Sequence, residues 1–276
     1  MSTAPNSTAF PPAVYHYTSQ LGLLGILQGK KLWLSSARHL NDSAEVNYAI
    51  EMLRQQLALR PKIEGVADEV WKKFCDDVSG YMPTVEGADH FVGSFSQRKD
   101  LLSQWRAYSG EGVGFSIGFD FKRLKDLADR KKFWFSRCSY NAADNTKSVN
   151  HFIDLGVQRL KEGRPEEAVT HCVVGLLLMA PRLKHPSFEE EKEWRLISGV
   201  GSDDNSQVRF RVGKSMIIPY KEFELVGEDG KTPITEVVVG PAPHMELSVA
   251  SVESLLLESG LGGVVVSLSD VPYRNW

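Results

Sequence analysis

Short strand-like and helix-like segments alternate along this chain without a fixed repeat. No GxGxxG motif follows a strand and strict strand-helix-strand alternation is absent, so a doubly wound nucleotide-binding fold is not expected. Hairpin-like neighbours and inserted helices instead predict an α+β fold with a mixed, largely antiparallel central sheet. The segments with strand chemistry are 14–18, 31–35, 91–96, 112–119, 133–140, 194–199, 208–212, 216–219, 235–239 and 263–267.

Helical patterns fill the intervals between these strands. They are expected at 21–28, 43–59, 63–81, 101–107 and 248–257, and two more lie between 141 and 183. The segment of about 141–185 is therefore interpreted as a helical insertion in a single α+β domain of residues 13–276, after a flexible tail of residues 1–12. The most apolar run, 172–180, is far shorter than the roughly twenty residues that span a bilayer, so no membrane contact is expected.

Composition narrows the classes of partner. The chain has 276 residues, a formal net charge of -3 and a pI near 6.2, which gives no general attraction to nucleic acid but allows a small nucleotide as ligand. Cys75, Cys138 and Cys172 lack CxxC or Cys/His spacing, so no metal is expected. Reduced cysteines and an N-terminus without signal-peptide features predict a cytoplasmic protein.

A run of carboxylates leads directly into a strand at residues 189–197 (EEEKEWRLI). If the extended part begins near Glu191, the period of two places Glu191, Glu193 and Arg195 on one face. Two carboxylates and a guanidinium on one strand face are costly to bury, which indicates a site. The alternative is a solvated helix end, with Ser187 as its cap.

Other polar side chains fall on strand faces in similar ways. His16 and Thr18 share one face of the first strand, and Ser94 and Ser96 share one face of strand 91–96, where hydroxyls suit hydrogen bonding to a polar ligand. Each also has an ordinary explanation, because single histidines and serines beside core aromatics are common. Lys184 fits either an anion contact or a surface charge.

Taken together, these segments resemble the bacterial family known as domain of unknown function 2971, over about residues 14–220. The family name carries no activity. A more distant similarity, in the first-strand histidine, the serine-rich central strand and the late Glu-x-Glu strand, is to ADP-ribosyltransferases, which bind NAD in a cleft of a split, mixed sheet. The segments that carry the family resemblance are 16–18, 32–35, 41–42 with Glu45, 94–96, 104–105 with Tyr108, Gly114, 118–119 and 188 with 191–195.

The second resemblance implies a role for each residue of the expected cleft. Glu193 would be the catalytic carboxylate that stabilises the oxocarbenium-like centre as nicotinamide leaves, and Glu191 would orient or deprotonate the acceptor. His16 would hydrogen-bond a ribose hydroxyl of NAD. Ser94 and Ser96 would order the cleft wall.

The same resemblance implies further contacts to NAD. Tyr17 or Trp33 would stack on nicotinamide, and Thr18 would belong to the NAD-binding strand. Arg195 would steady Glu193 or hold a pyrophosphate oxygen. The acceptor, a protein or a nucleic acid, stays open.

Three functions remain open from the sequence. The first is an NAD-dependent ADP-ribosyltransferase or NAD glycohydrolase, for which His16 and Glu193 should line one cleft. The second is a carboxylate-pair hydrolase of glycosidic or nucleoside bonds, which needs a second acid across a gap of roughly 5 to 10 Å. The third is a non-catalytic interaction protein, in which Glu191, Glu193 and Arg195 form a structural ion network.

Overall fold

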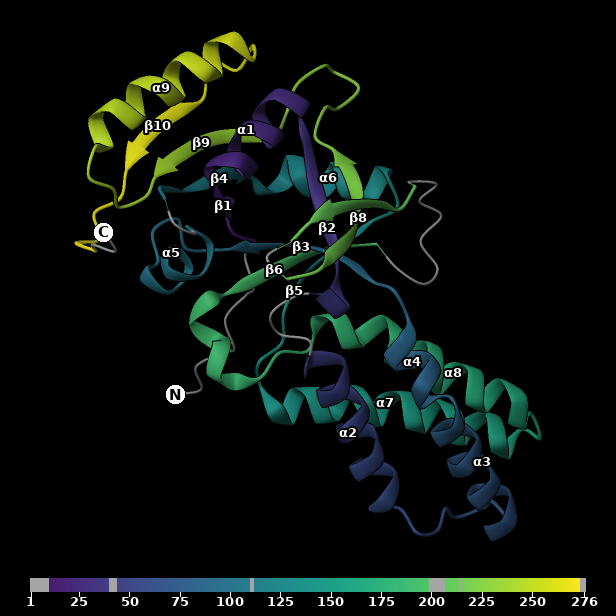
Figure 1. The fold of residues 1–276 in the computed structure, drawn as a ribbon. Coiled ribbons are helices and arrows are strands. Elements are labelled where there is room, and N and C mark those ends of the chain that lie inside the picture. The colour runs from purple at the N-terminus through teal and green to yellow at the C-terminus, as the bar shows by residue number, and fades with distance from the viewer. Residues whose placement is uncertain (1–9, 40–43, 110–111, 199–206, 214, 274–276) are drawn as a thin grey trace, which may run out of the picture.

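A mixed sheet forms the centre of the computed structural model, which describes residues 10–39, 44–109, 112–198, 207–213 and 215–273 (Figure 1). The strands follow the order β10-β9-β4-β1-β3-β2-β8-β7, while β6 pairs with β3 and with β5. The pairing of β10 with β9 is parallel and the other pairings among these strands are antiparallel, which confirms the predicted fold class. The strands are β1 (Ala13–Ser19), β2 (Lys31–Ser36), β3 (Phe91–Ser96), β4 (Gly114–Asp120), β5 (Trp134–Arg137), β6 (Glu193–Ser198), β7 (Arg209–Val212), β8 (Ile217–Glu224), β9 (Ile234–Val239) and β10 (Val265–Leu268).

Most of the helices fall into two groups, one packed on the sheet and one that forms a bundle of its own. Helices α1, α6 and α9 pack against one face, where their apolar stripes join the core of the sheet. Helices α2, α3, α4, α7 and α8 form a separate bundle with its own apolar core, below the sheet in the view of Figure 1. The helices are α1 (Gln20–Gly29), α2 (Ala44–Ala58), α3 (Asp68–Gly80), α4 (Met82–Gly87), α5 (Leu102–Tyr108), α6 (Phe121–Arg130), α7 (Ala142–Lys161), α8 (Pro165–Met179) and α9 (Met245–Glu258), with short 3-10 helices η1 (Ala37–His39), η2 (Ala180–Arg182) and η3 (Pro186–Glu191).

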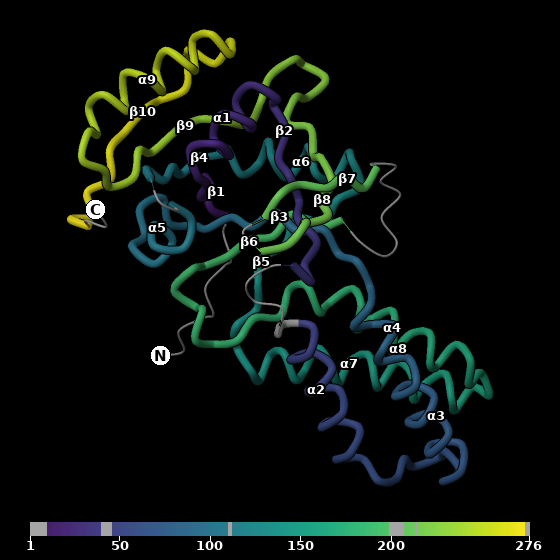
Figure 2. Tube along the Cα trace, in the orientation of Figure 1, coloured from purple at the N-terminus to yellow at the C-terminus, as the bar shows by residue number. Residues whose placement is uncertain are grey.

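Two separate parts of the sequence build the helical bundle. Helices α7 and α8 lie between β5 and β6, within the insertion expected at about 141–185, and α2 to α4 lie between β2 and β3. The trace in Figure 2 shows both parts running together away from the sheet. The apolar stripes of both parts meet in one core, where each part buries the stripes of the other.

The sheet splits at β3. One edge of this strand pairs with β6 along its whole length, from Phe91 to Ser96. The opposite edge meets β2 at Phe91 and Val92 and meets β1 at Ser96. Strands β1 and β2 therefore leave the same edge of β3 at its two ends, and the middle of β3 faces the gap between them.

Some segments differ from the sequence-based expectation. Residues 186–191 form η3 and Lys192 adopts a left-handed backbone with φ of 46°, so β6 begins at Glu193 and not near Glu191. Helix α6 was not anticipated, although its buried residues Phe121, Leu124, Leu127 and Ala128 have the spacing of an amphipathic helix. The Asp120 carboxylate caps this helix by accepting a hydrogen bond from the Arg123 amide. In the part of the chain that the structure describes, no helix is both long and apolar enough to cross a bilayer.

Candidate functional site

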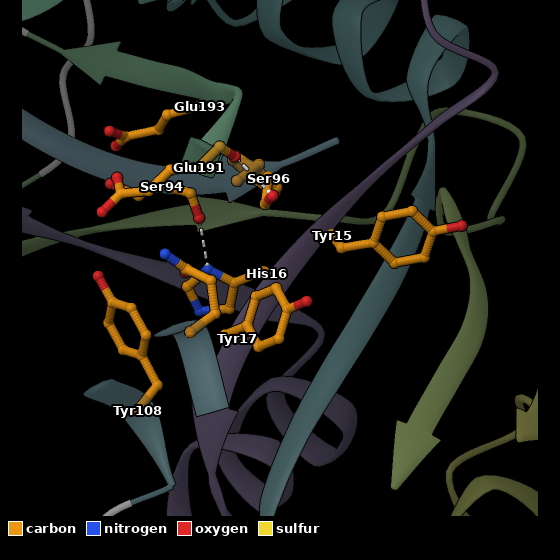
Figure 3. A pocket seen from close by; sticks show the side chains of 10 residues that line it. Tyr15, His16, Tyr17, Ser94, Ser96, Tyr108, Glu191 and Glu193 are labelled. Atoms are coloured by element: carbon orange, nitrogen blue, oxygen red, sulfur yellow. Dashed lines mark hydrogen bonds between the residues drawn. The ribbon is translucent and has the colours of Figure 1, made fainter. Parts of the chain in front are cut away.

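A pocket lies at the split in the sheet, where β1, β3 and the beginning of β6 come together (Figure 3). The pocket with its mouth has a volume of about 350 Å³. His16 and Glu193 both line it, as do Ser94, Ser96 and Glu191, so segments far apart in the sequence meet as predicted. The lining residues are Tyr15, His16, Tyr17, Ser94, Phe95, Ser96, Gln104, Tyr108, Glu191 and Glu193.

His16 occupies the gap between β1 and β3. Its Nδ1 lies 2.9 Å from the carbonyl oxygen of Ser94, and because a carbonyl only accepts, Nδ1 carries the hydrogen and Nε2 holds the lone pair. Burial lowers the pKa of His16, against the smaller opposing effect of this hydrogen bond. The ring is therefore neutral at pH 7 and presents a hydrogen-bond acceptor.

The two serines of β3 are placed beside the acidic strand by register. Ser94 pairs with Arg195 and Ser96 pairs with Glu193, so all four side chains lie on the same face of the sheet. The Ser96 hydroxyl donates to the carbonyl oxygen of Glu191 at 2.6 Å and accepts from the Arg98 amide at 3.0 Å. Ser96 thus fixes the peptide that carries Glu191.

Tyr17 connects the pocket to α5. Its hydroxyl donates to the Arg98 carbonyl at 2.7 Å and accepts from the Leu101 amide at 3.0 Å, while its ring meets Trp105 edge-on. Burial raises the pKa of Tyr17, so the phenol is neutral. Trp105 is 1% exposed and belongs to the core.

Four charged side chains form a cluster behind and along one wall of the pocket. Glu193 is 4% exposed; its Oε1 lies 2.8 Å from Arg195 Nε, and its Oε2 lies 2.6 Å from Lys184 Nζ. The same Nζ lies 2.5 Å from Glu191 Oε2. Arg195 also donates from Nη1 to the Pro181 carbonyl at 2.9 Å, which ties the cluster to η2. Two cations therefore balance two carboxylates.

These contacts determine the ionisation of the cluster. Burial raises the pKa of Glu193, but Arg195 and Lys184 together outweigh burial and bring it to about 2. Burial lowers the pKa of Lys184, but Glu193 and Glu191 outweigh that effect and raise it. Both groups are therefore charged at physiological pH.

Sequence reasoning missed part of this site. The sequence did not decide whether Lys184 contacts an anion or is a surface charge. In the structure it is 3% exposed and bridges the two glutamates. Tyr140 was not singled out, yet its hydroxyl accepts a hydrogen bond from the Glu193 amide at 2.8 Å. Two signals were present, a lysine directly after a long apolar helix and an aromatic residue just beyond β5, but neither identifies a partner.

Some predicted residues lie elsewhere. Trp33 is outside the lining and 49% exposed, and its ring lies tilted against Tyr220 with ring centroids 4.6 Å apart, so it is not the nicotinamide-stacking residue of this pocket. Thr18 is also outside the lining, with its hydroxyl packed against Gly22. Arg195 does steady Glu193, but at 2% exposure it is too deeply buried to hold a pyrophosphate oxygen. Residues 41–42 and the Glu45 side chain lie outside what the structure describes.

The low pKa of Glu193 predicts a specific loss of stability in acid. Because the folded-state pKa of about 2 lies below the ordinary value of 4.5, the stabilisation is complete above about pH 5 and is lost as the pH falls toward 2. The shift corresponds to about 3 kcal/mol. The free energy of unfolding, measured in urea, should fall between pH 7 and pH 2 by about 3 kcal/mol more for wild type than for Glu193→Gln. The exposed control Glu190→Gln should follow wild type; parallel curves for all three proteins would contradict the prediction.

The comparisons with known proteins give one match. No curated protein and no solved structure matches the chain. The family match is narrower than residues 14–220, the span of the resemblance seen in the sequence; it includes Lys184, Glu191 and Glu193 but not His16. Residues 104–196, from α5 into β6, match the model of the family described as "Protein of unknown function (DUF2971)", which confirms that resemblance.

Proposed function

We propose that this protein cleaves the nicotinamide-ribose bond of NAD, as an NAD glycohydrolase or an ADP-ribosyltransferase. The observation that carries the proposal is the meeting of His16 with Glu191 and Glu193 in one pocket, at the split of a mixed sheet. A concave site with a few convergent polar groups and shifted pKa values is the expected form of an active site. The distant resemblance to ADP-ribosyltransferases supplies the reaction class, as an analogy.

Each wall of the pocket suits one part of this reaction. His16 Nε2 accepts a hydrogen bond from a ribose hydroxyl, since the hydrogen on Nδ1 is already donated to Ser94. As the ribose C1′–N bond breaks, its electron pair passes to the pyridinium nitrogen and nicotinamide leaves as a neutral molecule. The cationic ribose carbon left behind is stabilised by the fixed negative charge of Glu193. Water or an acceptor then bonds to that carbon and gives its proton to Glu191.

The two cations of the cluster preorganise the carboxylates for this role. Lys184 and Arg195 keep Glu193 ionised in a buried position and hold its two oxygens in place. Glu191 is more accessible, with its side chain 19% exposed against 5% for Glu193. This difference suits Glu191 to the acceptor side and Glu193 to the ribose side.

The structure also bears on the two other functions. Glu191 and Glu193 both bind Lys184 Nζ, so they lie on the same side of the pocket and do not face each other across it as a carboxylate-pair hydrolase requires. The burial of Glu193 and Arg195 with mutual partners favours the non-catalytic alternative, in which the cluster serves only the fold. Turnover of NAD is what separates that alternative from the proposal.

The test is release of nicotinamide from NAD by the full chain, followed by chromatography. We expect wild type to release nicotinamide and His16→Ala to reduce kcat/KM by about 10- to 100-fold, the cost of one lost transition-state hydrogen bond in a dry site. Thr18→Val is the matched control, on the same strand but outside the pocket, and should keep wild-type activity. No release by folded wild type, supplied with NAD at stoichiometric enzyme over hours, would favour the non-catalytic alternative.

A further inference from the structure

The charge of the pocket lining differs from that of a phosphate site. Among the described residues that line it there are two carboxylates and three tyrosines, and no lysine or arginine. Sites for phosphate normally present arginine, lysine or a helix N-terminus to the anion. The lining therefore favours a neutral or positively charged ligand group.

The cations of the ion cluster do not reverse this preference. Lys184 and Arg195 balance the charge of Glu191 and Glu193, but they are 3% and 2% exposed and lie behind the carboxylates, outside the lining. The cluster thus presents its two carboxylates to the pocket, while its two cations do not line it. A group inside the pocket meets the nearer, negative charges first.

An aromatic ring stands across the pocket from the carboxylates. Figure 3 shows Tyr108 on the opposite side of the pocket from Glu191 and Glu193, with His16 and Ser94 between them. Tyr108 is 42% exposed, so much of its surface is accessible to a ligand. The hydroxyl end of Tyr108 points toward the side of the carboxylates (Figure 3). A ring beside carboxylates offers its π surface to an organic cation bound between them.

We propose that this pocket selects a flat organic cation, an N-substituted pyridinium, and leaves the phosphates of its ligand outside. The identity of the ligand rests on the proposed function, since the nicotinamide ring of NAD is such a cation whereas that of NADH is neutral. The pocket then discriminates by charge between the oxidised and the reduced dinucleotide. Once the ribose bond breaks, nicotinamide becomes neutral and loses that attraction, which favours its release.

The test is calorimetric binding of three probes of similar shape and different charge to the full chain. We expect 1-methylnicotinamide, a cation, to bind at least about tenfold more tightly than neutral nicotinamide, and the nicotinate anion to bind most weakly. Glu191→Gln should reduce the preference for the cation several-fold. Glu190→Gln removes a neighbouring carboxylate outside the pocket and should leave the preference unchanged.

The outcomes separate this inference from the proposed function. A cation preference without nicotinamide release would support the inference and remove the enzymatic proposal. Nicotinamide release with equal binding of the three probes, or with tighter binding of nicotinate, would overturn the inference and leave the enzymatic proposal standing. Absence of binding by all three probes would also overturn the inference.

Discussion

Arg195→Met should lower the free energy of unfolding by about 3 to 5 kcal/mol, the largest effect on stability that we expect from a single substitution at the site. The methionine fills similar space but leaves the buried Glu193 carboxylate with Lys184 as its remaining cation. It also removes the donor to the Pro181 carbonyl, a contact that joins β6 to η2. The loss thus combines an excess of one buried negative charge, since Lys184 alone then faces Glu191 and Glu193, with an unsatisfied acceptor.

Urea unfolding at pH 7 measures this effect, with Arg209→Met as the matched control. Arg209 also pairs with a glutamate, Glu222, at 3.2 Å, but its side chain is 56% exposed, so its removal should cost at most about 1 kcal/mol. The double variant Arg195→Met with Glu193→Gln should recover part of the loss, because it removes the excess carboxylate and leaves Lys184 paired with Glu191. Equal costs for Arg195→Met and Arg209→Met would show that the buried pair is not a determinant of stability.

Most of the strands and helices could be predicted because each carries a local signal, although helix α6 was missed. Alternation in β3, the apolar stripe of α2 and the Gly and Pro residues between elements are all readable over a few positions. The split of the sheet has no local signal. It depends on β1 and β2 pairing with opposite ends of the same edge of β3, a choice between distant segments that no single window of sequence contains.

The candidate site could be predicted where the residue type itself limits the explanation. His16 and Glu193 stood out because polar groups on strand faces need partners, and the fold provides them. Ser94 stood out for the same reason, and it lines the pocket with them. Lys184 could not be assigned, because its position comes from a tertiary contact: its amide donates to the Ser139 carbonyl at 2.9 Å. That contact directs the chain after η2 toward both glutamates.

Glu193→Gln should reduce nicotinamide release by about a thousandfold, a barrier increase of about 4 kcal/mol. The substitution keeps the size of the side chain but removes the charge that faces the developing cation at the ribose carbon. Because that cation exists in the transition state and not in bound NAD, the loss should appear in kcat. Binding of NAD should change far less, since His16 and the other lining residues remain.

The same substitution also perturbs the ion cluster, so loss of activity must be separated from loss of fold. Circular dichroism and calorimetric binding of NAD identify the folded fraction, and kcat is compared per folded molecule. Glu190→Gln, one residue before Glu191 and outside the pocket, is the matched control and should retain wild-type kcat. A folded Glu193→Gln protein that binds NAD but releases nicotinamide within tenfold of the wild-type rate would remove Glu193 from the chemistry. The cluster of Lys184, Glu193 and Arg195 would then be a structural feature beside an active site that uses other groups.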